Sequence, residues 1–389
     1  MKANLSVLDY KAHNVPVFTE KSNKEWVEYG AEDLYPYYLE DLFASSSIHG
    51  AIVKGTADMI YGNGLTSELK DTHVDQWLLL KDLIEDGTCL KQLSHDLKLF
   101  GHGYLNVVWT QDRSRPAKVY HVPTAMVRIK VADDPEEPQT FLVHPDWAEM
   151  RRSTVEVKEI PAFSVTDRES PSQMVHVKMY SPLGYYYSLP DYLGATNYIE
   201  LDRDISEFHL NNIKNGLFPS MMLTFNNGIP TDEERTDMER AIYAKFGGAS
   251  NAGKILINWN ENAQDAPTVE PFNLNDPHRT YEYLSKQVMQ EILSGHRVTS
   301  PLLFGLRGAG QGFGNNAQEM RDAYDLYLNV CVKPFQDTIV KALRPVLSAC
   351  DITLPLEFEK LVPAEFLGEE KKNDNSQKFA SPKLRAMCG

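Results

Sequence analysis

The chain has 389 residues, of which 42% are apolar, so it is long enough for two or three domains with proper cores. Its formal net charge of −15 excludes the broad basic face with which ordinary nucleic-acid binders neutralise phosphates. The four cysteines form no CxxC pair and the eleven histidines no HExxH pattern, so we expect no disulfide scaffold, metal or cofactor. No apolar run approaches the ~20 residues that span a bilayer, so we expect no membrane partner.

The N-terminal quarter is predicted to be an arm followed by two helices. Residues 1–30 are polar and are expected to be irregular. Apolar residues then recur at near-helical spacing over Asp33 to Ile60, and glycines follow at once. A second helix is predicted from about His73 to Phe100, with Gly87 weakening its middle.

From Gly103 the apolar pattern changes to that of strands. Segments rich in β-branched and aromatic residues alternate with turns of Pro, Asp and Gly, which predicts a β meander. The predicted strands are Tyr104–Thr110, Val119–Pro123, Met126–Val131, Thr140–His144 and Met174–Tyr180.

Two further helices are predicted on either side of a small unit. The helices cover about Pro190–Asn215 and Asp276–Ser294. The unit between them reads as strand, helix and strand: Pro219–Phe225, a capping box at Thr231–Glu234 opening a helix to Phe246, and Lys254–Trp259. So small a unit buries too little surface to fold alone, so it needs neighbours in this chain or in other copies.

The segment "GLRGAGQGFGNN" begins at Gly305 and is rich in glycine. It lacks the Gly-Lys-Ser/Thr of a phosphate-binding loop, and no predicted strand precedes it as a dinucleotide loop would require. A flexible linker is the simplest interpretation. A long helix from about Gln318 to Leu347 is expected to kink at Pro334, and Ile352–Phe358 reads as a strand. The tail from Gly368 is polar and is expected to be disordered.

Three stretches carry a family resemblance. They are "YPYYLEDLFASSSIHGAIVKGTADMIYGNGL" from Tyr35, "SLPDYLGATNYIELDRDISEFHLNNIKNGLFPS" from Ser188, and "SGHRVTSPLLFGL" followed by "GFGNNAQEMRDAYDLYLNVCVKPFQDTI". In this order, over about residues 30–345, they resemble a bacteriophage portal protein of the HK97-like class.

The resemblance implies an α+β, ring-forming portal fold. Its parts are an α/β wing, two stem helices bracketing a small strand–helix–strand clip, a mobile tunnel loop, a long kinked helix, and a crown that is reduced or absent. Mapped onto this chain, the parts are an N-terminal arm and wing at 1–188, the first stem helix at 189–216, the clip at 217–275, the second stem helix at 276–298, the tunnel loop at 299–316, the wing helix and last strand at 317–360, and a disordered tail at 361–389.

The resemblance also implies a function. Copies of the chain would form a dodecameric ring at one capsid vertex, the channel through which DNA is packaged and ejected. The implied partners are other copies of the chain, double-stranded DNA, the large terminase, the major capsid protein and scaffold, and the head–tail adaptor. The protein would reside in the virion at the portal vertex, and in the host cytoplasm during assembly.

The candidate site residues follow from this mapping. The first stem helix carries Glu200, Asp202, Asp204 and Glu207, which we expect to line an acidic channel; a solvated helix face is the alternative. In the glycine-rich loop we expect Arg307, Gln311, Asn315 and Asn316 to touch the DNA backbone transiently. In the clip we expect Glu233, Glu234 and Asp237 to face a partner.

Two other classes stay open at this point. An enzyme, either a nucleotide-driven motor or a hydrolase, would need a Walker A loop, a GxSxG elbow or metal-ligand spacing, and the sequence has none of these. We therefore expect no enzymatic activity. A non-viral oligomeric scaffold protein or an adhesion module is the alternative that the sequence does not exclude.

Overall fold

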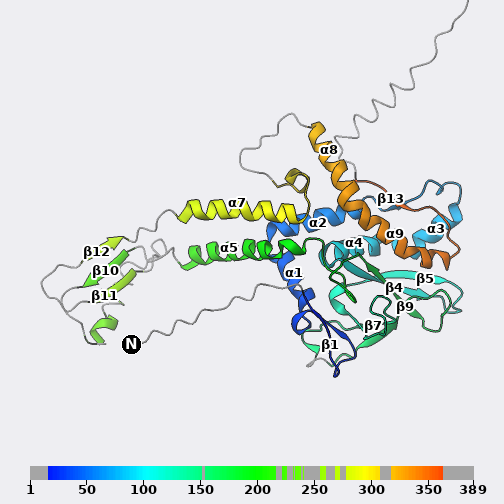
Figure 1. The fold of residues 1–389 in the computed structure, drawn as a ribbon, viewed down its shortest axis with the longest axis horizontal. Coiled ribbons are helices and arrows are strands. Elements are labelled where there is room, and N and C mark those ends of the chain that lie inside the picture. Colours follow the sequence, from blue (N-terminus) through cyan, green and yellow to red (C-terminus); the bar gives the residue numbers. More distant parts are fainter. Residues whose placement is uncertain are drawn as a thin grey trace, which may run out of the picture. The chain divides into compact units, whose positions relative to one another are not determined.

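The structure is a computed structural model (Figure 1). It describes residues 16–150, 154–215, 221–225, 231, 233–237, 240, 255–259, 268–271, 277–306 and 317–361. The chain divides into two compact units. The first comprises Met1–Phe43, Gly50–Leu193 and Arg297–Gly389, and the second comprises Ala44–His49 and Gly194–His296.

Two three-stranded antiparallel sheets form most of the described β part of the first unit, which also contains two two-stranded pairs (Figure 1). One has the order β5 (Pro116–Val122), β4 (His102–Trp109), β9 (Ser172–Lys178), and the other β6 (Val127–Ile129), β7 (Thr140–Val143), β8 (Lys158–Pro161). The five predicted strands exist, but the predicted single meander is wrong, and β8 was not predicted. Six of the eight residues of β4 are buried, so this strand lies in the middle of a sheet and pairs with a strand far along the chain.

Helices cover the first sheet and complete its core (Figure 1). The helix α4 (Thr88–Phe100) packs on β4 and β5, and α9 (Lys333–Ser348) packs on β9. Fully buried leucines of α4 and Ile339 of α9 belong to one apolar cluster with the inner residues of β4. Burial of such side chains contributes roughly 25 cal/mol per Å² of apolar area.

The helix predicted over 73–100 is two helices. The first, α3 (Val74–Leu83), ends in a 3₁₀ turn (Glu85–Gly87), and α4 begins at Thr88. Asp86 and Gly87 both have positive φ, 58° and 90°, and no α-helix continues through such a pair. A Cβ on Gly87 would lie 2.8 Å from the Tyr61 hydroxyl. The glycine therefore separates two helices instead of weakening one.

The helix predicted over 33–60 is also two helices, α1 (Tyr35–Ser45) and α2 (Ser47–Tyr61). Ser46 lies between them, and its hydroxyl accepts a hydrogen bond of 3.2 Å from the backbone N–H of His49. This is the bond that an N-cap serine makes to the third helical residue. The cap starts a new helix where apolar spacing alone suggests continuity.

Residues 16–30 are not the irregular arm that the sequence predicts. They form a hairpin of β1 (Phe18–Glu20) and β2 (Val27–Tyr29), and Val27 and Tyr29 are fully buried. Residues 1–15 of the predicted arm lie outside the described residues.

A buried ion pair follows this hairpin. The Asp33 carboxylate accepts hydrogen bonds from Arg128 Nε at 2.5 Å, from Trp26 Nε1 at 3.0 Å and from the Tyr29 backbone N–H at 2.9 Å. The Arg128 side chain is fully buried and also donates to the backbone oxygens of Ala125, Val127 and Asp33. Every charge is compensated, which is the condition for burying an ion pair.

The predicted long helix contains a π-helical interruption. The helix α8 (Ala317–Tyr327) leads into a π turn (Leu328–Val332), and α9 follows with Pro334 in its first turn. Proline has no N–H to donate and its ring clashes with the preceding turn; a π turn at this point removes the clash without ending the helix.

The strand predicted over 352–358 is only β13 (Glu357–Phe358), which pairs with β3 (Leu65–Thr66). Pro355 lies inside the predicted strand and cannot donate a ladder hydrogen bond, which explains the shortening. The tail predicted to be disordered, 361–389, lies outside the described residues except for Leu361.

The second unit contains a helix pair and a small sheet. The helices α5 (Thr196–Asn215) and α7 (Pro277–Gly295) pack against each other. They are antiparallel, because Ala195 before α5 meets Gly295 at the end of α7, where an added Cβ would lie 2.3 Å from the alanine Cβ. The start predicted at Pro190 is wrong: this proline accepts a turn hydrogen bond from Leu193, and the α-helix begins only at Thr196.

The sheet of the second unit has the order β11 (Ile255–Trp259), β10 (Met221–Phe225), β12 (Thr268–Pro271). The strands β10 and β11 are parallel, as a strand–helix–strand connection requires. Both were predicted, whereas β12, which is antiparallel to β10, was not.

We predict that Arg128→Met lowers the free energy of unfolding by about 3–5 kcal/mol, because it leaves the Asp33 carboxylate buried without its charge partner. Chemical denaturation followed by circular dichroism measures the change. Lys91→Met is the matched control: Lys91 is 61% exposed and lies 3.6 Å from Asp58, so its loss should cost less than about 1 kcal/mol. Equal effects of the two substitutions would contradict the assignment.

Candidate functional site

Three of the four predicted acidic residues share one face of α5. Glu200, Asp204 and Glu207 are spaced i, i+4 and i+7, so they follow one another along the helix. Asp204 and Glu207 are exposed and Glu200 is half-buried. We call these three residues the acidic stripe. The helix therefore presents three carboxyl groups in a row over about two turns.

Asp202 lies on a different face and has a structural partner. It is two residues from Glu200 and from Asp204, and residues so spaced do not face the same way on a helix. Its carboxylate accepts a hydrogen bond of 2.7 Å from the hydroxyl of Ser46, the same serine that caps α2. Asp202 thus joins α5 to the start of α2 within the second unit.

Arg203 partly compensates the acidic stripe. Its Nε and Nη2 each donate to Asp204 Oδ1 at 3.1 Å. Asp204 is 54% exposed in this pair, and exposed pairs contribute little free energy. The stripe keeps two carboxylates beyond the one paired with arginine.

A buried histidine pair lies in the same unit, and sequence reasoning missed it. His49 Nδ1 and His296 Nε2 are 3.0 Å apart, and both residues are fully buried. One nitrogen donates and the other accepts, so at least one ring is neutral. The two residues are 247 positions apart and belong to no motif. No local signal could have paired them.

Asp191 precedes α5 and belongs to the first unit. Its two carboxylate oxygens meet Lys98 Nζ at 2.7 Å and Arg297 Nη2 at 3.3 Å. The Lys98 side chain is 1% exposed, and its ammonium group also lies over the rings of Tyr192 and Phe335. Asp191 therefore compensates a buried charge and is no part of the acidic stripe.

The predicted capping box in the second unit is confirmed. The Glu234 carboxylate accepts from the Thr231 N–H at 3.1 Å and from the Thr231 hydroxyl at 2.9 Å. These hydrogen bonds hold the pKa of the Glu234 carboxyl below its ordinary value. Glu233 and Asp237 are exposed, and an exposed ion pair of 3.5 Å joins Asp237 to Arg240. A role of this surface in binding a partner stays a prediction.

The predicted loop residues Arg307, Gln311, Asn315 and Asn316 lie outside the described residues. The residues just before them make defined contacts within the first unit. The hydroxyl of Thr299 donates to Ala323 O at 2.7 Å, and a 3₁₀ turn covers Pro301–Phe304.

The Phe304 ring packs against Tyr327, with ring centroids 5.5 Å apart, and against Gly55, where an added Cβ would lie 2.7 Å from the Phe304 ring. Phe304 in the first part of the predicted loop thus contacts the core, and residues 307–316 lie outside the described residues. The mobility expected of the loop stays a prediction.

Within the described residues no cluster of three or more His, Cys, Asp or Glu side chains is suited to a metal ion. None of the helices in that part of the chain is both long and apolar enough to cross a membrane.

A family model described as "Phage portal protein" matches residues 82–358. One similar solved structure is from the neck of a native gene transfer agent particle with C12 symmetry: it is 18% identical, has a TM-score of 0.59, and the match covers 90% of each chain. Another is the crystal structure of an HK97 family phage portal protein from Corynebacterium diphtheriae, 11% identical with a TM-score of 0.50, covering 84% of this chain and 96% of that one.

Among curated proteins, an uncharacterised protein of Rickettsia bellii (strain RML369-C) is 26% identical over 168 residues, which are 43% of this chain and 40% of that protein. The chain thus matches about two fifths of the length of the curated relatives found. At these identities the structural likenesses establish a common fold.

Proposed function

This chain belongs to the phage portal protein family, and from that premise we propose that copies of it close into a ring of twelve that conducts double-stranded DNA at one vertex of a capsid. The family model covers most of the chain, and the fold is shared with a particle neck of twelve-fold symmetry. The chain would then be a structural component of the virion, made in the host cytoplasm and built into the capsid vertex.

The observation that supports the proposed channel is the acidic stripe on α5. A ring that conducts DNA must guide a polyanion without binding it tightly. Each phosphate neutralised by Lys or Arg adds affinity, and a ring multiplies that affinity by the number of its copies. Carboxylates in a row repel DNA from all sides of a ring and leave the axis as the path of lowest energy. The stripe lines the channel in this proposal, and Asp202 serves the fold.

The glycine-rich loop is the second element of the channel. We propose that Arg307 meets the phosphate backbone transiently and that Gln311, Asn315 and Asn316 offer uncharged hydrogen bonds to it. One cation per copy gives weak attraction that moving DNA can break. The packed turn at Pro301–Phe304 supplies a fixed base for this segment.

The small sheet unit at 217–275 is the proposed docking surface for the packaging terminase and then for the head–tail adaptor. Its exposed acids Glu233 and Asp237 are the candidate contacts, whereas Glu234 mainly caps its helix. The major capsid protein and scaffold would contact the first unit.

Electron microscopy of the purified chain tests the ring directly. We expect closed rings with a central hole when particles are viewed down the axis. A chain that stays monomeric at every concentration would contradict the proposal. An assembly without a central hole would instead favour a non-viral oligomeric scaffold.

The acidic stripe can be tested by charge reversal. Rings with Glu200→Lys, Asp204→Lys and Glu207→Lys should bind DNA about tenfold or more tightly at low salt, with a steeper salt dependence, because each new cation releases counterions. Fluorescence anisotropy with a DNA duplex measures the affinity.

The matched control reverses three exposed acids outside α5, Glu68, Asp71 and Glu156. A comparable gain in affinity from this control would mean that net charge alone, and not the stripe, governs binding.

The loop proposal is tested with Arg307→Ala, and Arg307→Lys as the control that keeps the charge. We expect the alanine variant to form rings but to package less DNA and to retain it less firmly, because one phosphate contact per copy is lost. Packaging and retention in assembled particles are the readouts. Unchanged values for both would remove Arg307 from the channel.

A further inference from the structure

A loop of the first unit exposes three large apolar side chains. Between β9 and α5, Tyr180 is 90% exposed, Leu183 53% and Tyr185 64%. We call these three residues the aromatic loop. Exposed apolar groups gathered on one short segment mark a protein interaction surface, and tyrosine is enriched at the centres of such surfaces.

Hydrogen bonds hold the backbone of the aromatic loop although its side chains face solvent. Lys178 Nζ donates to the Tyr185 backbone oxygen at 2.7 Å, and the Ser188 hydroxyl donates to Met179 O at 2.6 Å. A Cβ on Gly184 would lie 2.3 Å from Tyr187 O, so the tight turn needs glycine. A loop fixed before binding loses little conformational entropy on docking.

Acidic residues border the aromatic loop. Lys178, which holds the loop, forms an ion pair of 3.3 Å with Glu136, and the Tyr186 hydroxyl donates to Ala132 O. Both partners lie in the segment between β6 and β7, which also carries exposed Asp133 and Asp134. The loop thus offers an apolar centre with a negative border.

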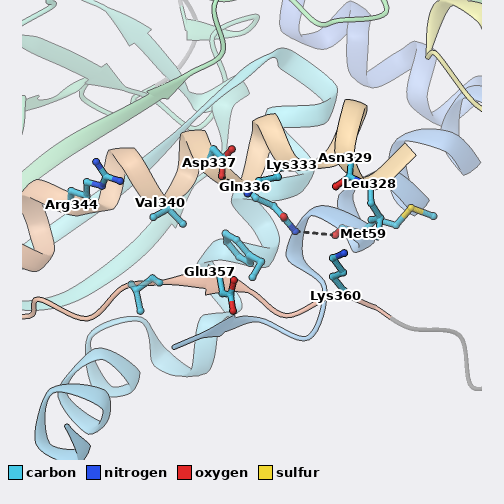
Figure 2. Close-up of a pocket in the computed structure, with 12 residues that line it drawn as sticks. Met59, Leu328, Asn329, Lys333, Gln336, Asp337, Val340, Arg344, Glu357 and Lys360 are labelled. Carbon is cyan, nitrogen blue, oxygen red and sulfur yellow. Dashed lines mark hydrogen bonds and ion pairs between the residues drawn. The ribbon is translucent and has the colours of Figure 1, made fainter. Parts of the chain in front are cut away.

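A groove elsewhere in the same unit combines apolar residues with basic ones, so its charge is complementary to that of the aromatic loop. Figure 2 shows this groove between α9 and the segment of β13. Three of its lining residues are apolar and half-buried: Met59, Val340 and Leu356. The cavity has a volume of about 500 Å³, within the roughly 300–1,000 Å³ of ligand pockets.

Three basic and two acidic side chains also line the groove. Lys333, Arg344 and Lys360 line it together with the acids Asp337 and Glu357 (Figure 2). Lys333 and Asp337 compensate each other in an exposed ion pair of 3.0 Å. In the described part of the chain no ion pair joins Arg344 or Lys360 to a carboxylate. Apart from the Lys333–Asp337 pair, the groove therefore has two positive charges and one negative charge, that of Glu357.

We infer that the aromatic loop of one copy docks into the α9–β13 groove of the next copy, with Asp133 and Asp134 opposite Arg344 and Lys360. This contact deepens the proposed ring and rests on it. Two complementary surfaces at different places on one chain bind head to tail, and such contacts generate a closed ring when the rotation from copy to copy closes. The docked side chains form the centre of a larger interface, and the charges fix its orientation.

Cross-linking between copies tests the contact. In a Cys388→Ser background, where the remaining cysteines are buried, Leu183→Cys with Val340→Cys should form disulfides between copies, seen as a ladder up to the closed ring. Mixed single variants should give dimers only, because each copy then carries one partner. The control pair is Leu78→Cys with Val340→Cys. Leu78 is 58% exposed, about as much as Leu183, but it lies on α3 and not in the aromatic loop, so this pair should give no ladder.

The outcomes separate this contact from the proposed ring. Rings of normal appearance without cross-links would overturn the contact and leave the ring standing, and cross-links only to another virion protein would assign the loop to that protein. A wild-type chain that never forms rings would overturn the ring itself.

Charge reversal gives a second test that does not depend on introduced cysteines. Arg344→Glu with Lys360→Glu should reduce the fraction of chain in rings about tenfold in native mass spectrometry, and adding Asp133→Lys with Asp134→Lys should restore it. These side chains are exposed, so folding should be unchanged by circular dichroism. Failure of the second pair to restore rings would contradict the contact.

Discussion

A buried lysine fixes the two points at which the chain leaves the first unit and returns to it. The ammonium group of Lys98 is nearly inaccessible to water, and Asp191 supplies its charge partner at 2.7 Å. The other oxygen of the same carboxylate meets Arg297. Asp191 precedes the excursion of the chain through residues 194–296, and Arg297 follows it. Removing one member of a buried ion pair leaves the other uncompensated. Lys98 of α4 therefore holds Asp191, and through Asp191 also Arg297, so the chain leaves and re-enters the first unit beside α4.

Polar contacts with at least one buried partner also hold other joints of the structure. Arg128 and Asp33 join the N-terminal hairpin to the second sheet, Ser46 joins the α1–α2 break to α5, and His49 meets His296. The apolar core supplies most of the driving force for folding. The polar contacts instead select one arrangement among the many that would bury similar apolar area, because an unsatisfied buried polar group is costly.

The proposed role of the acidic stripe depends on assembly into a ring. On an isolated helix three carboxylates would be an ordinary solvated face. In a closed ring of a portal protein the same carboxylates recur around an axis, and their weak individual repulsion is multiplied. The proposed head-to-tail contact is consistent with that symmetry, because a contact between different surfaces of the same chain forms a ring when the rotation from copy to copy closes. Binding between copies and repulsion of DNA are then properties of separate surfaces.

Local sequence by itself determined which segments are helical or extended, though not the breaks after Ser45 and Leu83. It also determined the capping box at Thr231, the interruption near Pro334 and the acidic charge of α5, because each depends on residues within one or two turns. The family resemblance added the order of the parts. Only the tertiary structure decided which strand lies beside β4, that Asp202 is bound by Ser46, that Asp191 serves Lys98, and that Phe304 packs on the core. These depend on pairs of residues far apart in the chain, whose meeting is set by the packing of the whole unit and leaves no periodic or local pattern in the sequence.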